Sequence, residues 1–209
     1  MIGRLVTFEG GDGSGKSTQL ARAAEHVRRT GADPLVTREP GGTPFAERAR
    51  ALLLDDETRP SALAEALLIQ AARADLVARV IRPALEAGRL VLCDRHCDST
   101  LAYQGAGRGL DLEALRQLNR VATGGITPDL TLLYDLEPEA GLERRARSGA
   151  PNRLDREPIE FHRRVRQGFL ELARREPERI VVLDARLDPA QLEARTWEAL
   201  EQLLQRARG

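Results

Sequence analysis

The sequence predicts an α/β fold in which a five-stranded parallel sheet is covered by helices on both faces. Its strands read as short, continuous apolar runs, which is typical of strands that are buried on both faces. These runs alternate with segments of helical periodicity, the order that βαβ units produce. A chain of 209 residues with 42% hydrophobic content can bury one such core. We therefore expect a single domain over residues 1–209.

The strands are expected where apolar residues follow one another without interruption. In chain order, these runs are Arg4–Glu9, Pro34–Arg38, Leu90–Asp94, Leu130–Leu136 and Ile180–Asp184. Ligands of parallel sheets bind beyond the carboxyl ends of the strands. The side chains that follow the strand ends are therefore the first candidates for a functional site.

The helices are expected where apolar residues recur at every third or fourth position. In chain order, these segments are about Ser17–Arg29, Phe45–Leu54, Ser61–Glu86, Asp111–Ala122, a helix begun by Pro138, an arginine-rich stretch to about Arg174, and Pro189–Arg206. Gly31 and Gly88 close the first and third of these segments, as glycines often do at helix C-termini. Between Asp94 and Gly109 we expect a loop.

The charge balance argues against several classes of partner. The chain has 32 basic and 32 acidic residues, so nothing indicates the one-signed surface that nucleic acid or an anionic membrane selects. No apolar run approaches the roughly 20 residues that span a bilayer. The N-terminus enters a strand pattern instead of a secretory leader. We therefore expect a cytoplasmic protein that binds neither nucleic acid nor membrane, and any anion site must be local.

One compositional feature singles out a residue. All but one of the 32 basic residues are arginine, and the exception is Lys16. An arginine offers a planar fork, whereas a lysine offers a compact ammonium. A chain this biased toward arginine keeps a lysine where that ammonium is required, so we expect Lys16 to have a chemical role.

Lys16 belongs to a complete phosphate-binding motif, G-x-x-x-x-G-K-S, between a predicted strand and a predicted helix. The motif comprises Gly10, Gly11, Asp12, Gly13, Ser14, Gly15, Lys16 and Ser17, and Thr18 follows it. Its glycines let successive backbone N–H groups point inward, and the following helix adds its positive dipole end. We expect Lys16 to hold the β- and γ-phosphates of ATP and Ser17 to ligate Mg²⁺. The alternative is a glycine-rich turn that only joins strand to helix.

Other residues must decide which kind of P-loop protein this is, because the motif is shared by kinases, GTPases and motor or transporter ATPases. The guanine-binding signature of GTPases needs a second lysine, and the length leaves no room for motor or transporter modules. A small-molecule kinase is therefore the leading class. Asp94 is expected to orient Mg²⁺, since it ends an apolar strand and Arg95 follows it. Asp135 and Asp184, which also end apolar runs, are the alternatives.

A mobile lid is expected at about residues 144–156. None of the variable loop positions 11–14 is basic, although phosphoryl transfer usually needs an arginine at the developing charge. Eight arginines lie between Arg144 and Arg166, on either side of a break at Gly149–Asn152. We expect most of them on a solvated helix face, and one or two closing over the phosphates.

Taken together, these residues resemble thymidylate kinase, and the resemblance covers nearly the whole chain. It rests on Phe8–Gly10 with the loop, and on Thr37–Thr43, Ala71–Arg73, Asp94–His96, Ser99–Gly105 and Pro128–Asp129. The resemblance implies a three-layer P-loop nucleoside monophosphate kinase of the bacterial type. Such an enzyme moves the γ-phosphate of ATP directly to dTMP, with Mg²⁺, on the route to dTTP. It also implies a homodimer, formed through the helices between Pro60 and Ala122.

The resemblance further implies which residues handle the phosphates. Arg38 and Arg95 would grip the phosphate of dTMP, which suits bidentate guanidinium chemistry. Asp12 would lie near the sugar 3′-hydroxyl and the metal. Arg153 matches the lid arginine of the bacterial enzymes, so that Lys16, Asp12, Arg95 and Arg153 form the implied catalytic set. The alternative for each arginine is a structural ion pair, and for Asp12 a turn that stabilises its own loop.

A second group of residues is implied to bind the nucleoside. Arg73 would donate a hydrogen bond to the thymine carbonyl, and Thr100 would face the base edge. Tyr103 would crowd the sugar 2′ position and so favour deoxyribose. Ser99 and Gln104 belong to the same motif and complete the implied substrate site. Surface polarity, helix capping and core packing are the plain alternatives for these residues.

One position departs from the family pattern. Many relatives carry an aromatic residue four positions before the base-reading arginine, whereas this chain has Ile69 there. An aliphatic side chain can still cover a base, but stacking worth about 1–3 kcal/mol would be missing. The base is therefore less firmly predicted than the reaction. The three histidines, His26, His96 and His162, are expected to be structural, because a phosphate acceptor needs no proton removed.

Two alternative functions stay open at this point. One is a kinase for another nucleoside monophosphate or for a deoxynucleoside, although two phosphate-gripping arginines favour a monophosphate. The other is a catalytically silent ATP-binding regulatory module, which would need only the loop. The acceptor-site residues argue against the second alternative.

Overall fold

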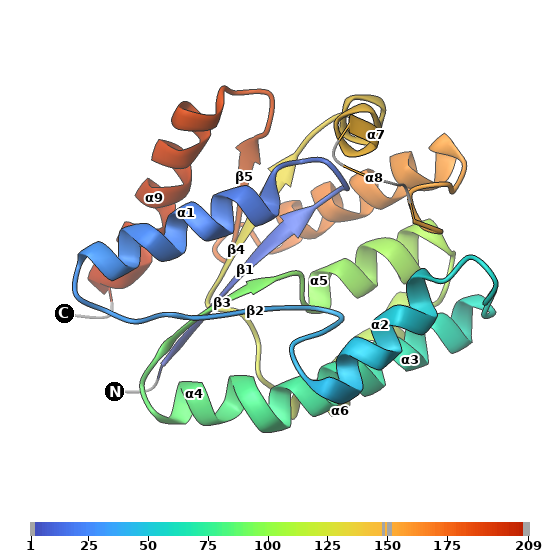
Figure 1. Ribbon diagram of the computed structural model, residues 1–209, viewed down its shortest axis with the longest axis horizontal. Coiled ribbons are helices and arrows are strands. Elements are labelled where there is room, and N and C mark those ends of the chain that lie inside the picture. Colours follow the sequence, from blue (N-terminus) through green and yellow to red (C-terminus); the bar gives the residue numbers. More distant parts are fainter. Residues whose placement is uncertain (1–2, 148, 150–151, 207–209) are drawn as a thin grey trace.

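A five-stranded parallel sheet forms the centre of the computed structural model (Figure 1). The structure describes residues 3–147, 149 and 152–206, with the side chain of Arg206 left out. The strands are β1 (Arg4–Gly10), β2 (Leu35–Arg38), β3 (Leu90–Asp94), β4 (Leu130–Asp135) and β5 (Ile180–Asp184). Their order across the sheet is β2-β3-β1-β4-β5. The predicted parallel sheet is confirmed, and β1 at its centre places Val6 between Leu92 and Leu130.

Helical segments connect these strands. They are α1 (Lys16–Arg29), α2 (Pro44–Leu54), α3 (Ala62–Leu76), η1 (Val77–Ile81), α4 (Arg82–Glu86), α5 (Cys97–Thr100), η2 (Leu101–Gly107), α6 (Leu112–Thr123), α7 (Pro138–Arg147), α8 (Ile159–Arg175) and α9 (Pro189–Arg206). In the described part of the chain, none of them combines the length and the apolar character that crossing a membrane requires.

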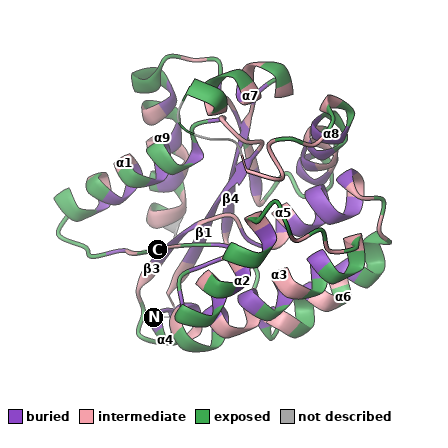
Figure 2. Cartoon of the chain, turned by 45° about the vertical axis from the view of Figure 1, so that its right-hand side comes forward, coloured by how far each residue is buried: buried purple, intermediate pink, exposed green. Residues whose placement is uncertain are grey.

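The helices cover the sheet in two layers. On one face, α1 and α9 pack through Leu20, Val27 and Leu200 against strand residues such as Phe8 and Leu132. On the other face, the α3–η1–α4 segment packs against β1 and β3, and α8 with η2 packs against β4 and β5. Figure 2 shows the strands and the inward helix surfaces as buried and the outward helix surfaces as exposed. This is the three-layer arrangement that the continuous apolar strands predict.

The expected loop between Asp94 and Gly109 is a wrong prediction, because most of it is helical. Segments α5 and η2 fill it, and η2 lies directly against α8. Small residues on both elements allow this contact, since a Cβ on Gly107 would lie 2.7 Å from Phe161 Cε2 of α8, and a Cβ on Gly168 of α8 would lie 2.7 Å from the Cβ of Ala106. Tertiary packing thus overrides the weak helix propensity of glycine in this segment. The result is that side chains after β3 project from a rigid, buried element.

The long segment predicted as one helix over Ser61–Glu86 is a continuous helical rod with a wide turn inside it. Its middle part, η1, has π-type hydrogen bonds, and the backbone N–H of Arg82 bonds to the carbonyl of Val77. Pro83 follows at once and has no N–H to offer to the preceding turn. A local change of the hydrogen-bond ladder is a known way to accommodate such a gap.

The expected lid falls partly outside the described residues. Ser148, Ala150 and Pro151 belong to that part, so the break predicted at Gly149–Asn152 has no full structural description. The described flanks are the end of α7 and residues 152–158, which lead into α8. These flanks lie near the edge of the sheet that the carboxyl ends of the strands form (Figure 1).

Candidate active site

The P-loop lies between the end of β1 and the start of α1. Gly15 precedes α1 with φ 88°, and no side chain caps the first N–H groups of the helix. Gly13 has φ 73°, and a Cβ there would lie 1.9 Å from the carbonyl oxygen of Gly141 in α7. Only glycine therefore fits at this position. The uncapped helix start and the loop N–H groups form a cradle suited to an anion.

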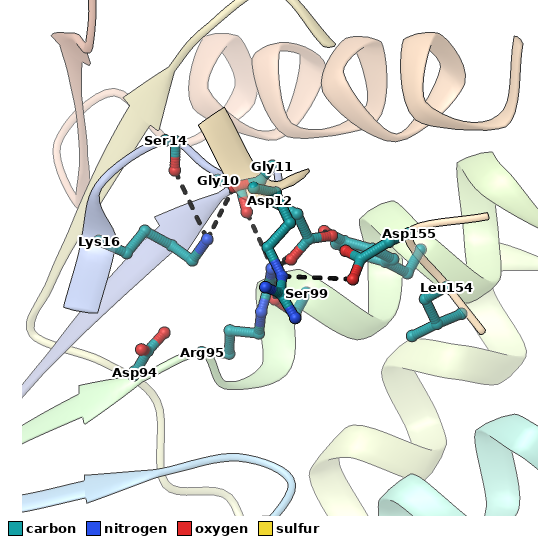
Figure 3. Close-up of polar contacts among 12 residues, drawn as sticks. Gly10, Gly11, Asp12, Ser14, Lys16, Asp94, Arg95, Ser99, Leu154 and Asp155 are labelled. Carbon is teal, nitrogen blue, oxygen red and sulfur yellow. Dashed lines mark hydrogen bonds and ion pairs between the residues drawn. The ribbon is translucent and has the colours of Figure 1, made fainter. Parts of the chain in front are cut away.

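Lys16 lies inside this cradle and is only 6% exposed. Its Nζ donates hydrogen bonds to the Gly11 carbonyl at 2.8 Å and, more weakly, to Ser14 Oγ at 3.5 Å. Burial, together with the charge of nearby Arg95, lowers the pKa of Lys16 to about 8. Figure 3 shows the ammonium pointing into the loop, with Asp94 and Arg95 at the same mouth. The solitary lysine of the chain thus lies where a polyphosphate would be held.

Ser17 and Asp94 come together beside Lys16. The Ser17 hydroxyl donates a 2.5 Å hydrogen bond to Asp94 Oδ2. The two rival aspartates are engaged elsewhere, because Asp135 accepts two hydrogen bonds from Arg166 and Asp184 pairs with nearby Arg186. Of the three candidates, the structure brings Asp94 to the P-loop.

These oxygens fit a magnesium ion that is shared with phosphate. Hydroxyl and carboxylate oxygens are hard ligands, and Mg²⁺ usually takes one or two of them together with waters and substrate phosphates. Within the described ranges, no three His, Cys, Asp or Glu side chains are grouped so that they could hold a metal by themselves. Any ion at Ser17 and Asp94 would therefore depend on phosphate oxygens for the rest of its coordination.

Arg95 is held in place by its backbone and by four hydrogen bonds. Within the described residues it is the only non-glycine residue with a positive φ, 69°. Its guanidinium donates to the Gly10 carbonyl at 3.0 Å, Ser99 Oγ at 3.2 Å, Asp12 Oδ1 at 2.7 Å and Tyr103 Oη at 3.0 Å. Backbone strain of this kind persists only where the surroundings fix it, and it is concentrated at functional sites. The hydrogen bonds hold the guanidinium between the P-loop and η2.

Asp12 is the anionic partner of Arg95. Burial alone would raise its pKa, but the charges of Arg95 and Lys16 lower it to about 2. The carboxylate also accepts a hydrogen bond from Tyr103 Oη at 2.9 Å. Asp12 is therefore ionised near neutral pH and is held between the P-loop and η2.

Two adjoining cavities meet at these residues. The P-loop cavity, of about 700 Å³, is lined by Asp12, Gly13, Gly15, Lys16, Ser17, Thr18, Arg38, Glu39, Arg50, Asp94, Arg95, Arg144, Arg145 and Asn152. The inner cavity, of about 110 Å³, is lined by Asp12, Glu39, Pro40, Arg50, Leu53, Leu54, Glu65, Ile69, Arg73, Arg95, His96, Ser99, Thr100, Tyr103, Gln104, Asn152 and Leu154. Asp12 and Arg95 belong to both walls. A group held in one cavity can therefore reach a group held in the other.

The expected base-reading arginine, Arg73, lies at the wall of the inner cavity and is 1% exposed. Its Nε donates to Glu39 at 2.7 Å, one Nη1 bond goes to Asn119 at 2.7 Å, and Nη2 donates to the His96 carbonyl at 3.0 Å. Gln70, beside Ile69, accepts the remaining Nη1 bond at 2.9 Å. The side chain is thus fixed before any ligand arrives, and Ile69 also lines the cavity where the family's aromatic residue is expected.

Two buried polar atoms on the inner cavity have no hydrogen-bond partner among the described residues, and they belong to Thr100 and His96. The atoms are Thr100 Oγ1 and His96 Nε2, and both residues are at most 1% exposed. Leaving a buried donor or acceptor unpaired costs about 1–3 kcal/mol, so such atoms need an explanation. A ligand in the inner cavity that supplies the missing hydrogen bonds is the simplest explanation.

His96 is expected from the sequence to be structural, but the structure also gives it a place in the inner cavity wall. Its Nδ1 contacts Glu39 Oε1 at 2.6 Å. Burial alone would lower the pKa of His96, but the neighbouring Cys97 and Glu39 raise it to about 10. The ring is therefore protonated near neutral pH, and its Nε2 is a donor at the cavity wall.

The arginines expected at the phosphates lie in different places. Arg38 lines the P-loop cavity, where its Nη2 donates to both oxygens of Glu47 at 2.9 Å. Arg144 and Arg145 line the same cavity. Arg153 does not; its Nη2 donates at 2.6 Å to Glu65, which lines the inner cavity. In this structure the expected lid arginine therefore contacts the inner cavity wall and not the P-loop.

Sequence reasoning missed three buried carboxylates that hold the site together: Glu9, Glu39 and Glu65. Glu9 accepts from the backbone N–H of His96 at 2.7 Å and from Ser99 Oγ at 2.6 Å. Glu39 orients Arg73, and Glu65 lies against the expected lid arginine. The only sequence signal was the place of Glu9 and Glu39 inside motifs that carry the family resemblance.

Comparison with known proteins shows what this chain is similar to. The family model described as thymidylate kinase matches residues 8–195. A thymidylate kinase of Deinococcus radiodurans is 54% identical over 200 residues, which cover 96% of this chain and 97% of that protein. One from a Synechococcus strain is 55% identical over 197 residues, or 94% of each chain. The crystal structure of thymidylate kinase from Ehrlichia chaffeensis superposes with a TM-score of 0.79 at 32% identity, over 96% of this chain and 99% of that one.

Proposed function

The chain belongs to the thymidylate kinase family, and from this premise we propose that its P-loop cavity holds ATP while its inner cavity holds dTMP. The enzyme moves the γ-phosphoryl group of ATP to the phosphate of dTMP and so forms dTDP. The single observation that supports this division best is the shared wall of the two cavities at Asp12 and Arg95. A phosphate gripped by Arg95 from the inner side would face the end of a polyphosphate that lies along Lys16.

The donor is assigned to the P-loop. Residues 10–18 would wrap the polyphosphate with backbone N–H groups, and Lys16 would exchange its bond to the Gly11 carbonyl for the β- and γ-phosphates. Ser17 and Asp94 would hold Mg²⁺, which when bound would neutralise part of the phosphate charge. Arg144 and Arg145, which also line this cavity, would supply positive charge that the loop itself lacks.

The acceptor phosphate is assigned to Arg95, with Arg38 beside it. Arg95 is pre-positioned by Asp12 and Tyr103, so it would lose little freedom when it binds a phosphate. Arg38 is 53% exposed in its pair with Glu47, and an exposed pair of this kind contributes little stability. Arg38 can therefore leave Glu47 and turn to a phosphate with little loss of free energy. Catalysis is then positioning plus charge neutralisation, without a covalent intermediate.

The nucleoside is assigned to the far end of the inner cavity. Arg73, Thr100 and Gln104 supply polar groups there, and Ile69 supplies an apolar face for the base. Tyr103, which stands between Asp12 and the aromatic rings of α8, would pack beside the sugar and crowd its 2′ position. Because Ile69 replaces an aromatic ring, we expect thymine to be held chiefly by hydrogen bonds and shape.

We further propose that two copies of the chain pair through α2, α3 and α6. These helices pack together and carry exposed apolar side chains on their outward surface. These side chains are Phe45 at 51%, Leu52 at 51%, Leu63 at 54%, Leu67 at 46% and Val121 at 80% exposed. Large apolar side chains exposed on helices that pack together are the kind of surface that an interface covers. Sedimentation should give a dimer, and a monomer at micromolar concentration would contradict the proposed dimer interface. The cytoplasmic location stays a prediction of the sequence.

An acceptor panel tests the proposed function. ADP release from ATP is measured with magnesium and, in separate reactions, dTMP, dUMP, dCMP, dGMP, AMP and thymidine. We expect the highest kcat/KM for dTMP. Higher activity with thymidine would favour a nucleoside kinase, and ATP binding without release of ADP by any acceptor would favour the silent regulatory module.

A further inference from the structure

Glu65 is a buried carboxylate on α3 whose oxygens are shared by three side chains. It is 1% exposed. Oε1 accepts from Gln104 Nε2 at 2.9 Å and from Arg108 Nε at 3.2 Å. Oε2 accepts from Arg153 Nη2 at 2.6 Å and from Arg108 Nη2 at 3.2 Å. One carboxylate thus links α3, η2 and the segment that leads into α8.

The two arginines keep this carboxylate ionised despite its burial. Burial raises the pKa of Glu65, but the hydrogen bonds from Arg153, Gln104 and Arg108 and the charge of Arg108 lower it overall. Arg108 is itself held in place by Glu157 at 2.7 Å and by the ring of Phe161, 4.6 Å from its guanidinium carbon. An ionised carboxylate can only accept hydrogen bonds.

Because the ionised carboxylate of Glu65 can only accept hydrogen bonds, it fixes the orientation of the Gln104 amide. A glutamine side chain can present either its NH₂ group or its carbonyl oxygen to a neighbour. Facing an ionised Glu65, Gln104 must offer the NH₂ group. Its Oε1 then accepts no hydrogen bond from the described residues, and Gln104 lines the inner cavity at 3% exposure. A fixed acceptor is thereby presented at the wall of that cavity.

We propose that Glu65 is a positioning residue that sets the base specificity of the enzyme, because it holds the Gln104 amide with its oxygen toward the bound base. This inference rests on the proposed acceptor site. Thymine and uracil carry an N–H at ring position 3, which can donate to this oxygen. Cytosine has a bare nitrogen lone pair there, which would face the oxygen and be repelled. A site built around one hydrogen-bond pattern rejects the mismatched ligand strongly.

The experiment replaces Glu65 by glutamine in the full chain. The amide introduced by this substitution can act as donor or acceptor, so the Gln104 amide is free to turn and accept cytosine. We expect the ratio of kcat/KM for dTMP over dCMP to fall about tenfold or more in E65Q. Arg73 still meets the 4-amino group of cytosine, so part of the discrimination remains. The ratio for dTMP over dUMP should stay unchanged, because these two bases differ only in a methyl group.

A matched variant separates this effect from the loss of a charge near Arg108. Glu157→Gln removes the other carboxylate that Arg108 contacts, but Glu157 touches neither Gln104 nor the inner cavity. We expect E157Q to keep the wild-type ratio of dTMP to dCMP. An equal fall in E157Q and E65Q would contradict the proposal, and so would an unchanged ratio in E65Q.

A double-mutant cycle tests whether Glu65 acts through Gln104. Gln104→Met removes the amide and keeps the length of the side chain. Adding E65Q to Q104M should lower discrimination no further, since the group that Glu65 orients is already gone. A further fall of the same size as in the single variant would overturn the positioning role.

Two further readouts keep the test decisive. If thermal unfolding shows that E65Q does not fold, Glu65→Asp keeps the charge and draws the carboxylate back, and a wild-type ratio in folded E65D would contradict the proposal.

The activity of the wild type separates the role of Glu65 from the proposed function. A wild-type enzyme that does not phosphorylate dTMP defeats the proposed function itself. An active wild type with an insensitive E65Q defeats only the role of Glu65.

Discussion

The hydroxyl of Ser17, in the first turn of α1, donates a 2.5 Å hydrogen bond to Asp94 Oδ2 at the end of β3. Ser17 closes the P-loop after β1, and Asp94 ends β3, the strand paired with β1. Neighbouring parallel strands bring their carboxyl ends to one edge, so sheet topology itself creates this contact. It places a hydroxyl and a carboxylate oxygen beside Lys16, where the proposed Mg²⁺ would bind.

Loss of either oxygen should raise the magnesium requirement. We expect Ser17→Ala and Asp94→Asn to increase the Mg²⁺ concentration for half-maximal rate by about tenfold or more. Initial rates across a magnesium titration at fixed ATP measure this. Asp184→Asn is the matched control, because Asp184 also ends a strand but pairs with Arg186. The same shift in the control, or none in Asp94→Asn, would contradict the metal assignment.

The unpartnered hydroxyl of Thr100 predicts a change in binding without a loss of stability. Thr100→Val removes a buried atom with no partner in the described part of the chain, so thermal stability should be kept or raised. The KM for dTMP should rise about tenfold, the equivalent of one hydrogen bond. Thr131→Val is the control, since Thr131 Oγ1 contacts Thr7 and Asp98 and its loss should lower stability with KM unchanged. Destabilised Thr100→Val with normal KM would exclude Thr100 from the site.

The contact between Arg153 and Glu65 predicts which kinetic constant changes most in Arg153→Ala. We expect the KM for dTMP to rise about tenfold and kcat to fall less, because a buried carboxylate loses a 2.6 Å partner at the inner cavity. Arg144→Ala, on the P-loop cavity, should lower kcat more than KM. Steady-state kinetics with varied dTMP gives both values. A larger fall in kcat than rise in KM for Arg153→Ala would contradict this expectation and would support a role of Arg153 at the phosphates, as the family resemblance implies.

Buried Glu9 predicts a pH-dependent stability. Burial, with the charge of Asp98, raises its pKa from an ordinary value of 4.5 to about 7. Between these values the native state keeps a proton that the unfolded state has released, so this group's contribution to stability falls as pH rises. Glu9→Gln cannot titrate there. Its free energy of unfolding relative to wild type should therefore increase by roughly 1–3 kcal/mol between about pH 5 and pH 8.

Urea unfolding of both proteins at the two pH values measures the Glu9 effect. Glu113→Gln, an exposed substitution on α6, is the control and should follow the wild-type trend. A difference between Glu9→Gln and wild type that does not change with pH would show that Glu9 does not titrate in this range in the folded protein.

Much of the fold could be predicted because its signals are local. The runs Leu90–Asp94 and Ile180–Asp184 are continuous apolar segments that end in aspartate, and the structure has both strands with the same bounds. The P-loop is equally local, since its glycines and Lys16 follow one another in the sequence. The loop expected after β3 is wrong because this segment is helical, with Gly107 packed closely against Phe161 and Val165 of α8. Sequence spacing alone carries no information on that contact.

The candidate site was predictable where a motif names the residue and not where distant residues meet. Glu65 reads as an ordinary polar position at the start of a helix, yet its partners Gln104 and Arg153 lie 39 and 88 residues away. Only the folded chain shows that it is buried. The place of Arg153 has the same origin, because one charge among eight nearby arginines has no local feature that fixes its partner.

A single-turnover measurement of γ-phosphoryl transfer tests the central claim that Lys16 of the P-loop holds the donor phosphates. Enzyme in excess, ATP labelled in the γ-phosphate, magnesium and dTMP are mixed, and labelled dTDP is followed in time. Wild type should form dTDP, and Lys16→Ala at saturating nucleotides should slow the transfer step by about 10²-fold to 10³-fold. Transfer by Lys16→Ala at the wild-type rate, or no labelled dTDP from the wild type, would contradict the account.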